Sequence, residues 1–237
     1  MSFLKAEWRK LAIVNYKIDP KVLESFIPEG TELDIWNGIC YVSLVGFMFK
    51  NTKLLGLKIP FHINFEEVNL RFYVKRRDKD TWKRGVVFIK EIVPKPALTY
   101  VANTIYKEHY ETLPMAHLWT TNKNNTQVQY KWKINNVWQS FQIEAYLNPV
   151  EIPENSEVEF ITEHYWGYSK INNNQTNEYE VTDPKWLHYP VLSYNIDVDF
   201  ELTYGKNFRF LNTITPKSVM LAEGSEITVE SKKTLYL

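Results

Sequence analysis

The chain has 237 residues, with 28 basic and 28 acidic side chains and a formal net charge of zero. This balance argues against a protein that binds nucleic acids or anionic membrane surfaces, because such a protein normally carries an excess of positive charge. The single cysteine excludes an internal disulfide, and no apolar stretch approaches the roughly 20 residues of a membrane helix. Aromatic residues make up 15% of the chain, which favours sheets with broad packed faces.

The first predicted element is a short helix. Asp19 is a suitable cap for it, and Pro20 suits its first position. Strands are expected to follow over residues 38–48, 67–74 and 85–89, because each segment is rich in β-branched, aromatic or alternating apolar residues. The last two of these strands are expected to pair with each other in antiparallel orientation.

A second helix is predicted where Leu98, Val101 and Ile105 recur at helical spacing, and it should cross one end of the sheet. Strand patterns then return, and Asn135-Asn136 predicts a two-residue turn between two of them. The later strands are expected over residues 126–134, 137–146, 159–169, 179–191, 195–203, 218–222 and 227–229. No linker or internal repeat divides the chain, so a single domain over residues 1–237 is predicted.

The segment over residues 67–74 is the most informative one, because its two faces differ. Side chains alternate between the faces of a strand. One face is wholly apolar and comprises Val68, Leu70, Phe72 and Val74. The other face is polar and comprises Glu67, Asn69, Arg71 and Tyr73. Two interpretations of the polar face stay open, a surface that meets solvent and a wall of a polar cavity.

Two further clusters qualify as parts of a site. Tyr165 and Trp166 lie in an aromatic segment beside glutamate and histidine, which suits either a pocket wall or ordinary sheet packing. Arg9 precedes an apolar strand start and is either a rim charge or an inward clamp for an anion. No phosphate-binding loop or hydrolase elbow occurs, and no histidine pairs with cysteine at metal-ligand spacing, so neither a metal site nor a cofactor is predicted.

Three motifs together carry a resemblance to a known family. They are Trp8-Arg9-x-Leu11, Phe65-x-Glu67-x-Asn69-Leu70-Arg71-x-Tyr73-Val74 and Ser218-Val219-x-Leu221-Ala222-x-Gly224-Ser225. The chain resembles the YqjF-like family of uncharacterised bacterial proteins over nearly its whole length, and that family is similar to the acetoacetate decarboxylase-like superfamily. The resemblance implies a mainly β (β-rich α+β) single-domain antiparallel β-barrel, with an interior pocket and one or two short helices.

The same resemblance bears on the chemistry. The decarboxylases use a Schiff-base lysine beside a second lysine, and both follow a proline. Met115 and Ala116 occupy the corresponding positions here, which implies that the nucleophile is missing. A pocket arginine and a pocket glutamate of the decarboxylases fall near Arg9 and Glu67, whereas a second glutamate falls near Ser43 and is absent.

The leading hypothesis is a protein that binds a small organic ligand inside the barrel, without Schiff-base decarboxylase chemistry, with a carboxylic acid as one candidate. The residues expected to contact the ligand are Arg9, Glu67, Asn69, Arg71, Tyr165 and Trp166. Two alternatives stay open, a non-catalytic structural or interaction protein with a satisfied internal polar network, and an enzyme that uses Glu67 as general acid/base. Charge appears early in residues 1–7, so the cytoplasm is the expected location.

Overall fold

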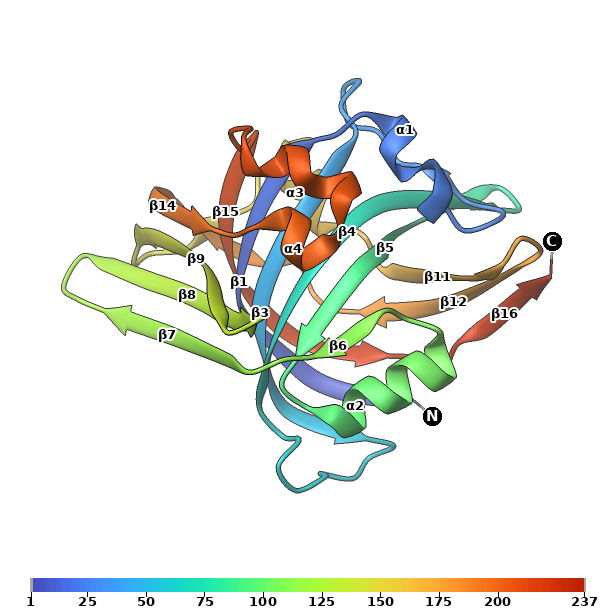
Figure 1. Ribbon diagram of the computed structural model, residues 1–237, viewed down its shortest axis with the longest axis horizontal. Helices are drawn as coiled ribbons and strands as arrows, with labels where there is room; N and C mark the ends of the chain where they lie inside the picture. Colours follow the sequence, from blue (N-terminus) through green and yellow to red (C-terminus); the bar gives the residue numbers. More distant parts are fainter. Residues whose placement is uncertain (1, 237) are drawn as a thin grey trace.

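A computed structural model describes residues 2–236, which form two β-sheets and several short helices (Figure 1). The larger sheet has 12 strands: β1 (Leu4–Lys17), β2 (Glu32–Leu33), β3 (Tyr41–Leu54), β4 (Phe65–Asp78), β5 (Thr81–Val93), β6 (Tyr110–Thr112), β10 (Val150–Glu151), β11 (Trp166–Asn172), β12 (Gln175–Thr182), β13 (Leu187–Tyr189), β15 (Ser218–Val229) and β16 (Lys233–Tyr236). The smaller sheet has four: β7 (Met115–Thr121), β8 (Asn125–Ile134), β9 (Val137–Tyr146) and β14 (Val191–Asp197).

The larger sheet curls around its own inner face (Figure 1). Its strand order is β10-β13-β15-β1-β3-β4-β5-β11-β12-β16, with β2 beside β4 and β6 beside β5. β12 also pairs with β15, so strands from opposite halves of this order are hydrogen-bonded to each other. Most pairs are antiparallel, including the expected β4–β5 pair, and the β5–β6 and β5–β11 pairs are parallel.

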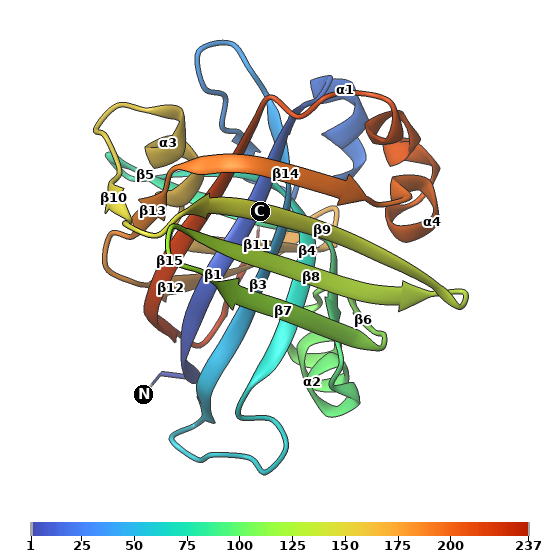
Figure 2. The same ribbon diagram turned by 90° about the vertical axis from the view of Figure 1, so that its left-hand side faces the viewer.

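The smaller sheet covers the outer face of the larger one, and its strands run across β1, β3 and β4 (Figure 2). Tyr130 and Phe141 from the smaller sheet join Leu44 and Leu70 from the larger sheet in one buried apolar core. The β8–β9 turn is the one expected from the sequence, because Asn135 and Asn136 both adopt positive φ angles there.

The position of this core decides how the two faces of β4 are used. The apolar face of the strand packs into the core between the sheets and comprises Val68, Leu70, Phe72 and Val74. Glu67, Asn69 and Arg71 therefore point to the inner side of the curled sheet, where they are 2%, 1% and 7% exposed. The polar face does not meet bulk solvent.

Helices are short and more numerous than the one or two that were expected. They are α1 (Pro20–Leu23), α2 (Pro96–Val101), α3 (Glu157–Thr162) and α4 (Phe200–Tyr204), with 3-10 turns η1 (Glu24–Phe26) and η3 (Lys206–Asn212) and a π-helical turn η2 (Ala102–Tyr106). The sequence correctly predicted α1 and the α2–η2 segment. None of the helices within residues 2–236 is long and apolar enough to cross a membrane.

Three predicted strands were partly wrong. The one over 179–191 is interrupted at 183–186, between β12 and β13. In the other two, local caps start helices inside the predicted strand. The segment predicted as a strand over 159–169 begins in α3, where the Ser156 hydroxyl accepts a hydrogen bond from the Glu159 N–H. The segment 195–203 ends in α4, where the Asp199 carboxylate accepts one from the Leu202 N–H. These caps outweigh the strand propensity of the aromatic and β-branched residues that follow them.

Candidate functional site

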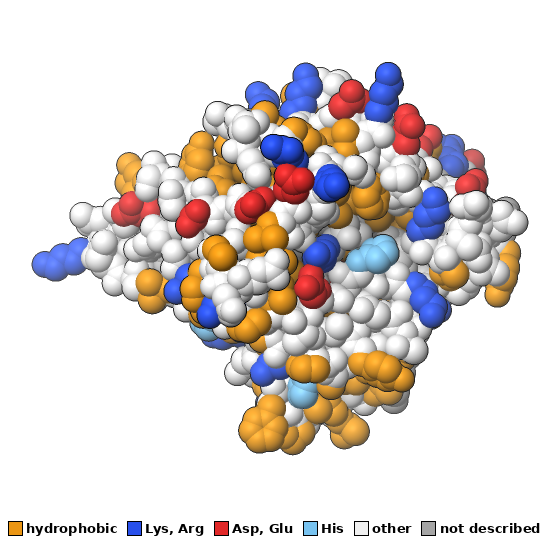
Figure 3. Space-filling model, in the orientation of Figure 1, with side chains coloured by type: hydrophobic (Ala, Val, Ile, Leu, Met, Phe, Trp, Pro, Cys, Tyr) orange, Lys and Arg blue, Asp and Glu red, His pale blue; other side chains and the backbone are white. Residues whose placement is uncertain are grey.

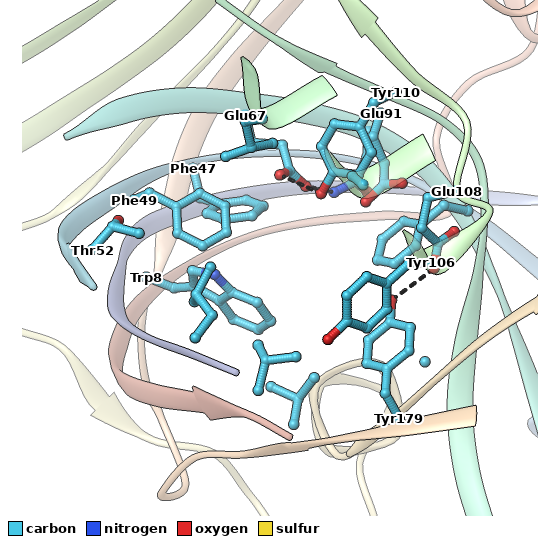
Figure 4. A pocket seen from close by; sticks show the side chains of 18 of the residues that line it. Trp8, Phe47, Phe49, Thr52, Glu67, Glu91, Tyr106, Glu108, Tyr110 and Tyr179 are labelled. Carbon is cyan, nitrogen blue, oxygen red and sulfur yellow. Dashed lines mark hydrogen bonds between the residues drawn. The ribbon is translucent and has the colours of Figure 1, made fainter. Parts of the chain in front are cut away.

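A cavity of about 230 Å³ lies on the inner side of the curled sheet. Its walls come mainly from β1, β3, β4, β5 and β12 and from the α2–η2 segment, and most of them are apolar or aromatic. Figure 4 shows Trp8, Phe47 and Phe49 along one side of the cavity, with Glu67 beside Phe47, and the other labelled glutamates and the tyrosines along the opposite side. A concave, mostly apolar space with a few converging polar groups is the usual form of a small-molecule site.

One rim of the cavity is apolar as well. Thr52 and Leu54 at the end of β3 and Ile59 on the connection between β3 and β4 line the cavity. The same connection exposes Leu57 and Phe61, and Figure 3 shows hydrophobic side chains gathered at this lower edge of the molecule. A small apolar compound would therefore meet apolar surface before it reached the interior.

Three buried carboxyl groups converge on one side of the cavity: Glu67, Glu91 and Glu108 (Figure 4). Sheet register brings the first two together, because Glu91 on β5 lies opposite Asn69 on β4 and opposite Tyr110 on β6. The Asn69 amide donates to Glu67 over 2.9 Å, and the Tyr110 hydroxyl donates to the same carboxylate over 3.2 Å.

Glu108 reaches the group from a different element. It follows η2 after Lys107, which adopts a positive φ of 59° and turns the chain at the end of the π-helical turn. The hydroxyl of Tyr179 on β12 donates to Glu108 over 2.9 Å. The carboxyl cluster, defined as Glu67, Glu91 and Glu108, is thus assembled from β4, β5 and the segment before β6.

Burial makes the ionised form of these carboxyl groups unfavourable. It raises the pKa of Glu67 to about 7, against the opposing hydrogen bonds from Asn69 and Tyr110 and the charge of Arg71. Burial also raises the pKa of Glu108 to about 8. The pKa of Glu91 lies well above its ordinary value, first because of burial and then because of the negative charges of the other two carboxyls. The carboxyl cluster therefore retains protons near neutral pH.

A second polar group lies further along β4. Arg71 lines the cavity with His164 and Asp183, and the Nε atom of Arg71 has no hydrogen-bond partner within residues 2–236. The Nε2 atom of His164 lies 3.2 Å from the Asp34 carboxylate, and burial lowers the pKa of this histidine to about 4. Burial, with the charge of Glu163, raises the pKa of Asp183 to about 7. His164 is therefore neutral at physiological pH.

Four of the six residues proposed from the sequence line the cavity: Glu67, Asn69, Arg71 and Trp166. Tyr165 does not, because side chains alternate and the cavity side of this segment belongs to His164 and Trp166. The Tyr165 hydroxyl instead donates to Glu163.

Arg9 also lies outside the group of cavity-lining residues. The inward positions of β1 belong to Trp8 and Leu11, and a bulge at Lys10, which has a φ of 55°, leaves Arg9 on the opposite side. The Arg9 side chain binds the Glu7 carboxylate over 2.8 Å. The expectation of an inward anion clamp at Arg9 is therefore corrected to a partly exposed ion pair.

Sequence reasoning missed Glu91, Glu108, Tyr110 and Tyr179. Glu91 left one usable signal, since it is an acidic residue that lies with Lys90 between the apolar pairs Phe88-Ile89 and Ile92-Val93. Glu108, Tyr110 and Tyr179 left none, because they reach the cavity through the π-helical turn and through strand pairings between distant parts of the chain.

The lining of the cavity, as described within residues 2–236, contains no lysine. Met115 and Ala116 begin β7 in the smaller sheet and do not line the cavity either. No group of histidine, cysteine, aspartate and glutamate suited to a metal ion occurs within the same residues. The polar groups that line the cavity are therefore carboxyl, hydroxyl, amide, guanidinium and imidazole groups.

Solved structures of similar shape include acetoacetate decarboxylase and an acetoacetate decarboxylase-like enzyme. Acetoacetate decarboxylase from Legionella pneumophila subsp. pneumophila str. Philadelphia 1 matches with a TM-score of 0.64 and 13% identity, over 98% of this chain and 86% of that one. An acetoacetate decarboxylase-like enzyme from Sphingomonas wittichii RW1 matches with a TM-score of 0.65 and 10% identity, over 100% of this chain and 94% of that one. The enduracididine biosynthesis enzyme MppR matches with a TM-score of 0.68 and 9% identity, over 100% of this chain and 90% of that one. That structure is a complex with the condensation product of pyruvate and imidazole 4-carboxaldehyde. The chain therefore has the acetoacetate decarboxylase-like fold.

Sequence similarity then places the chain within a family. It belongs to the DUF2071 family of uncharacterized conserved proteins, whose model matches residues 5–226. A relative is the uncharacterized protein YqjF of Bacillus subtilis (strain 168), which is 25% identical over 189 residues, covering 78% of this chain and 74% of the relative. The resemblance to YqjF-like proteins that the motifs indicated is confirmed.

Proposed function

We propose that this protein binds a small, mainly apolar organic molecule in its interior cavity. The observation that carries the proposal is a set of buried polar atoms that line the cavity without a hydrogen-bond partner within residues 2–236: Asn69 Oδ1, Arg71 Nε and Glu91 Oε2. Buried polar atoms are normally paired, because an unpaired one costs about 1–3 kcal/mol. A ligand that pairs with them explains their placement better than the rival expectation of a satisfied internal network.

The arrangement of the strands supports an enclosed site. The pairings β15–β1–β3–β4–β5–β11–β12–β15 form a ring, and we propose that this ring is the closed barrel implied by the resemblance. The fold neighbour MppR was solved in complex with pyruvate, which supports the binding of a small organic molecule by this fold.

Schiff-base chemistry is not part of this proposal. An imine with a carbonyl substrate needs an amine inside the cavity. The described lining offers no lysine, and the residues that match the lysine pair of the decarboxylases lie in the smaller sheet.

Filling the cavity should block binding. Ala102 lines the cavity from η2, so Ala102→Trp is expected to reduce binding of small aromatic compounds at least about tenfold, because the indole occupies their space. Thr104→Trp is the matched control, since Thr104 lies on the same turn and is exposed. Saturation-transfer NMR with a mixture of such compounds measures the difference. Equal saturation with both variants would contradict an interior site.

A second candidate function is proton transfer by Glu67. A carboxyl with a pKa of about 7 inside an apolar cavity is poised to act as general acid and base near neutral pH. The simplest such step removes a proton from the carbon next to a ketone and returns a proton to the same carbon.

Deuterium exchange tests this candidate. In D2O the protein is expected to exchange the α-hydrogens of cyclohexanone faster than buffer does, and Glu67→Gln should lower the protein-dependent rate at least about a hundredfold. Glu66→Gln is the control, because Glu66 is the neighbouring residue and pairs with His117 outside the cavity lining. NMR follows the exchange, and an unchanged rate in Glu67→Gln would remove this candidate.

A further inference from the structure

The carboxyl cluster contains more hydrogen-bond acceptors than its neighbours can satisfy. The Tyr110 hydroxyl has one proton and donates it to Glu67, and the Tyr179 hydroxyl donates to Glu108. The amide nitrogen of Asn69 also donates to Glu67. Glu91 Oε2 has no hydrogen-bond partner within residues 2–236. The Tyr110 hydroxyl lies close enough to lower the pKa of Glu91, but it has no second proton to donate.

A second acceptor beside it points to a ligand independently of the acidic residues. Asn69 is 1% exposed and lines the cavity, and its Oδ1 atom has no partner within the described chain although its amide nitrogen is bonded. Asn69 lies directly opposite Glu91 in the β4–β5 register. Once Glu91 is ionised, two neighbouring acceptors without donors face the same space, and a group rich in N–H bonds would satisfy both.

We infer that this side of the cavity binds the ammonium group of a small organic amine, with Glu91 and Asn69 accepting its hydrogen bonds. The inference rests on the proposed function and names the class of ligand for that same cavity. A primary ammonium group has three donors and a positive charge, so it answers both the unpaired acceptors and the surplus of carboxyl groups.

The rest of the cavity suits the apolar part of such an amine. Trp8 and Phe49 lie across the cavity from Glu91 and Glu108, and Phe47 lies beside Glu67 in the β3–β4 register (Figure 4). Aromatic faces attract cations and pack against apolar carbon skeletons. The walls therefore accept both a hydrocarbon body and a charged end.

The other titratable side chains that line the cavity do not reverse the preference for a positively charged ligand beside the glutamates. They are His62, Arg71, Tyr106, Tyr110, His164, Tyr179 and Asp183. Arg71 is the lone permanent cation among the described lining residues, and it shares its part of the cavity with Asp183 and neutral His164. A carboxylate ligand placed against the glutamates would bury a negative charge in an apolar site without a cation of the cluster to pair with it, which is unfavourable.

Binding of an ammonium group should be coupled to proton release. The raised pKa values keep protons on the carboxyl cluster, and a bound cation favours the ionised form of Glu91 or its neighbours. One proton then leaves the cluster for solvent as the ammonium binds. The affinity is therefore expected to rise with pH by up to about tenfold per unit while the amine itself stays protonated.

A matched ligand series on the unaltered protein tests the inference. Benzylamine, benzyl alcohol and benzoate share one ring and carry a positive, a neutral and a negative head group. Isothermal titration calorimetry is expected to show benzylamine binding at least about tenfold more tightly than benzyl alcohol, and benzoate most weakly. Titrations in two buffers of different ionisation enthalpy should reveal release of up to one proton with benzylamine alone.

Glu91→Gln locates the effect, because the amide keeps the size of the side chain and removes its charge. Its affinity for benzylamine should fall at least about tenfold, while the affinity for benzyl alcohol changes less than about twofold. Glu66→Gln serves as the control, since Glu66 lies next to the cluster in sequence and binds His117 instead. If Glu91→Gln does not fold, the ligand series on the unaltered protein still tests the inference, and Glu67→Gln, which removes another carboxyl of the cluster, should also weaken the binding of benzylamine more than that of benzyl alcohol.

The outcomes separate the two proposals. Tightest binding of benzoate, or equal binding of amine and alcohol, overturns the amine inference and leaves the interior ligand site in place. Failure of all three compounds to bind also overturns the amine inference, and the Ala102→Trp comparison then decides the interior site by itself.

Discussion

Gly224→Ala is expected to destabilise the protein by roughly 3–5 kcal/mol, against about 1 kcal/mol for the control Gly38→Ala. Both glycines have nearly the same φ, 80° for Gly224 and 77° for Gly38, so both substitutions carry the cost of a left-handed backbone. A methyl group on Gly38 would have nothing within 4 Å, whereas on Gly224 it would overlap the carbonyl oxygen of Trp8.

The difference arises from a close approach of two backbones. Gly224 on β15 lies opposite Arg9 on β1, next to the bulge that directs Trp8 into the cavity wall. The Trp8 carbonyl belongs to the main chain and cannot rotate away from an added methyl group. Chemical denaturation of the two variants measures the difference, and equal losses of stability would show that this approach is looser than described.

The pH dependence of stability is expected to differ strongly between the unaltered protein and Glu67→Gln. Glu67 titrates near 4.5 when unfolded and at about 7 in the folded protein. Between these values the folded state binds more protons than the unfolded state, so the free energy of unfolding falls as the pH rises. Replacing the carboxyl by an amide removes this loss. As the pH rises from about 5.5 to 8, the free energy of unfolding of the variant should therefore increase by about 2 kcal/mol relative to that of the unaltered protein.

Other buried groups also change the free energy of unfolding in this pH range, and the direction of each change follows from its pKa shift. Glu108 and Asp183, whose pKa values are raised to about 8 and about 7, also lower stability as the pH rises. His164 acts oppositely, because its folded pKa of about 4 lies below its ordinary value of 6.5, so its contribution grows with pH up to about 6.5. The contributions of Asp183 and His164 are common to both proteins and cancel in their difference. The pKa of Glu108 is raised in part by the charge of Glu67, so Glu67→Gln also reduces the loss of stability that Glu108 causes as the pH rises.

Urea denaturation at several pH values measures the effect. Glu24→Gln is the matched control, because it removes a carboxyl that is exposed to solvent. A constant difference in unfolding free energy between Glu67→Gln and the unaltered protein from about pH 5.5 to 8 would show that Glu67 is not protonated in the folded state.

Local patterns were sufficient to predict several elements. Alternation in residues 67–74 predicted a strand with one apolar and one polar face, and Asn135-Asn136 predicted the β8–β9 turn. These features depend on neighbours two to four residues apart, which the sequence displays directly. Where a cap competed with strand propensity, as at Ser156 and Asp199, the same local reasoning chose the wrong element.

The members of the site were harder to predict than its existence. Glu67, Asn69 and Arg71 followed from one strand, but the partners of Glu67 come from elsewhere in the chain. Glu91 reaches it through strand register and Glu108 through the left-handed turn at Lys107. Arg9 was misplaced because a β-bulge changes which side chains face inward, and no residue pattern in the strand announced the bulge.

The sequence by itself determined that β4 has two unlike faces and that the chain belongs with YqjF-like proteins. Only the tertiary structure decided that the polar face is buried. The smaller sheet covers the apolar face of β4, and the curl of the larger sheet turns Glu67 toward the cavity. Alternation specifies that two faces differ, but what each face meets depends on contacts between residues far apart in the chain.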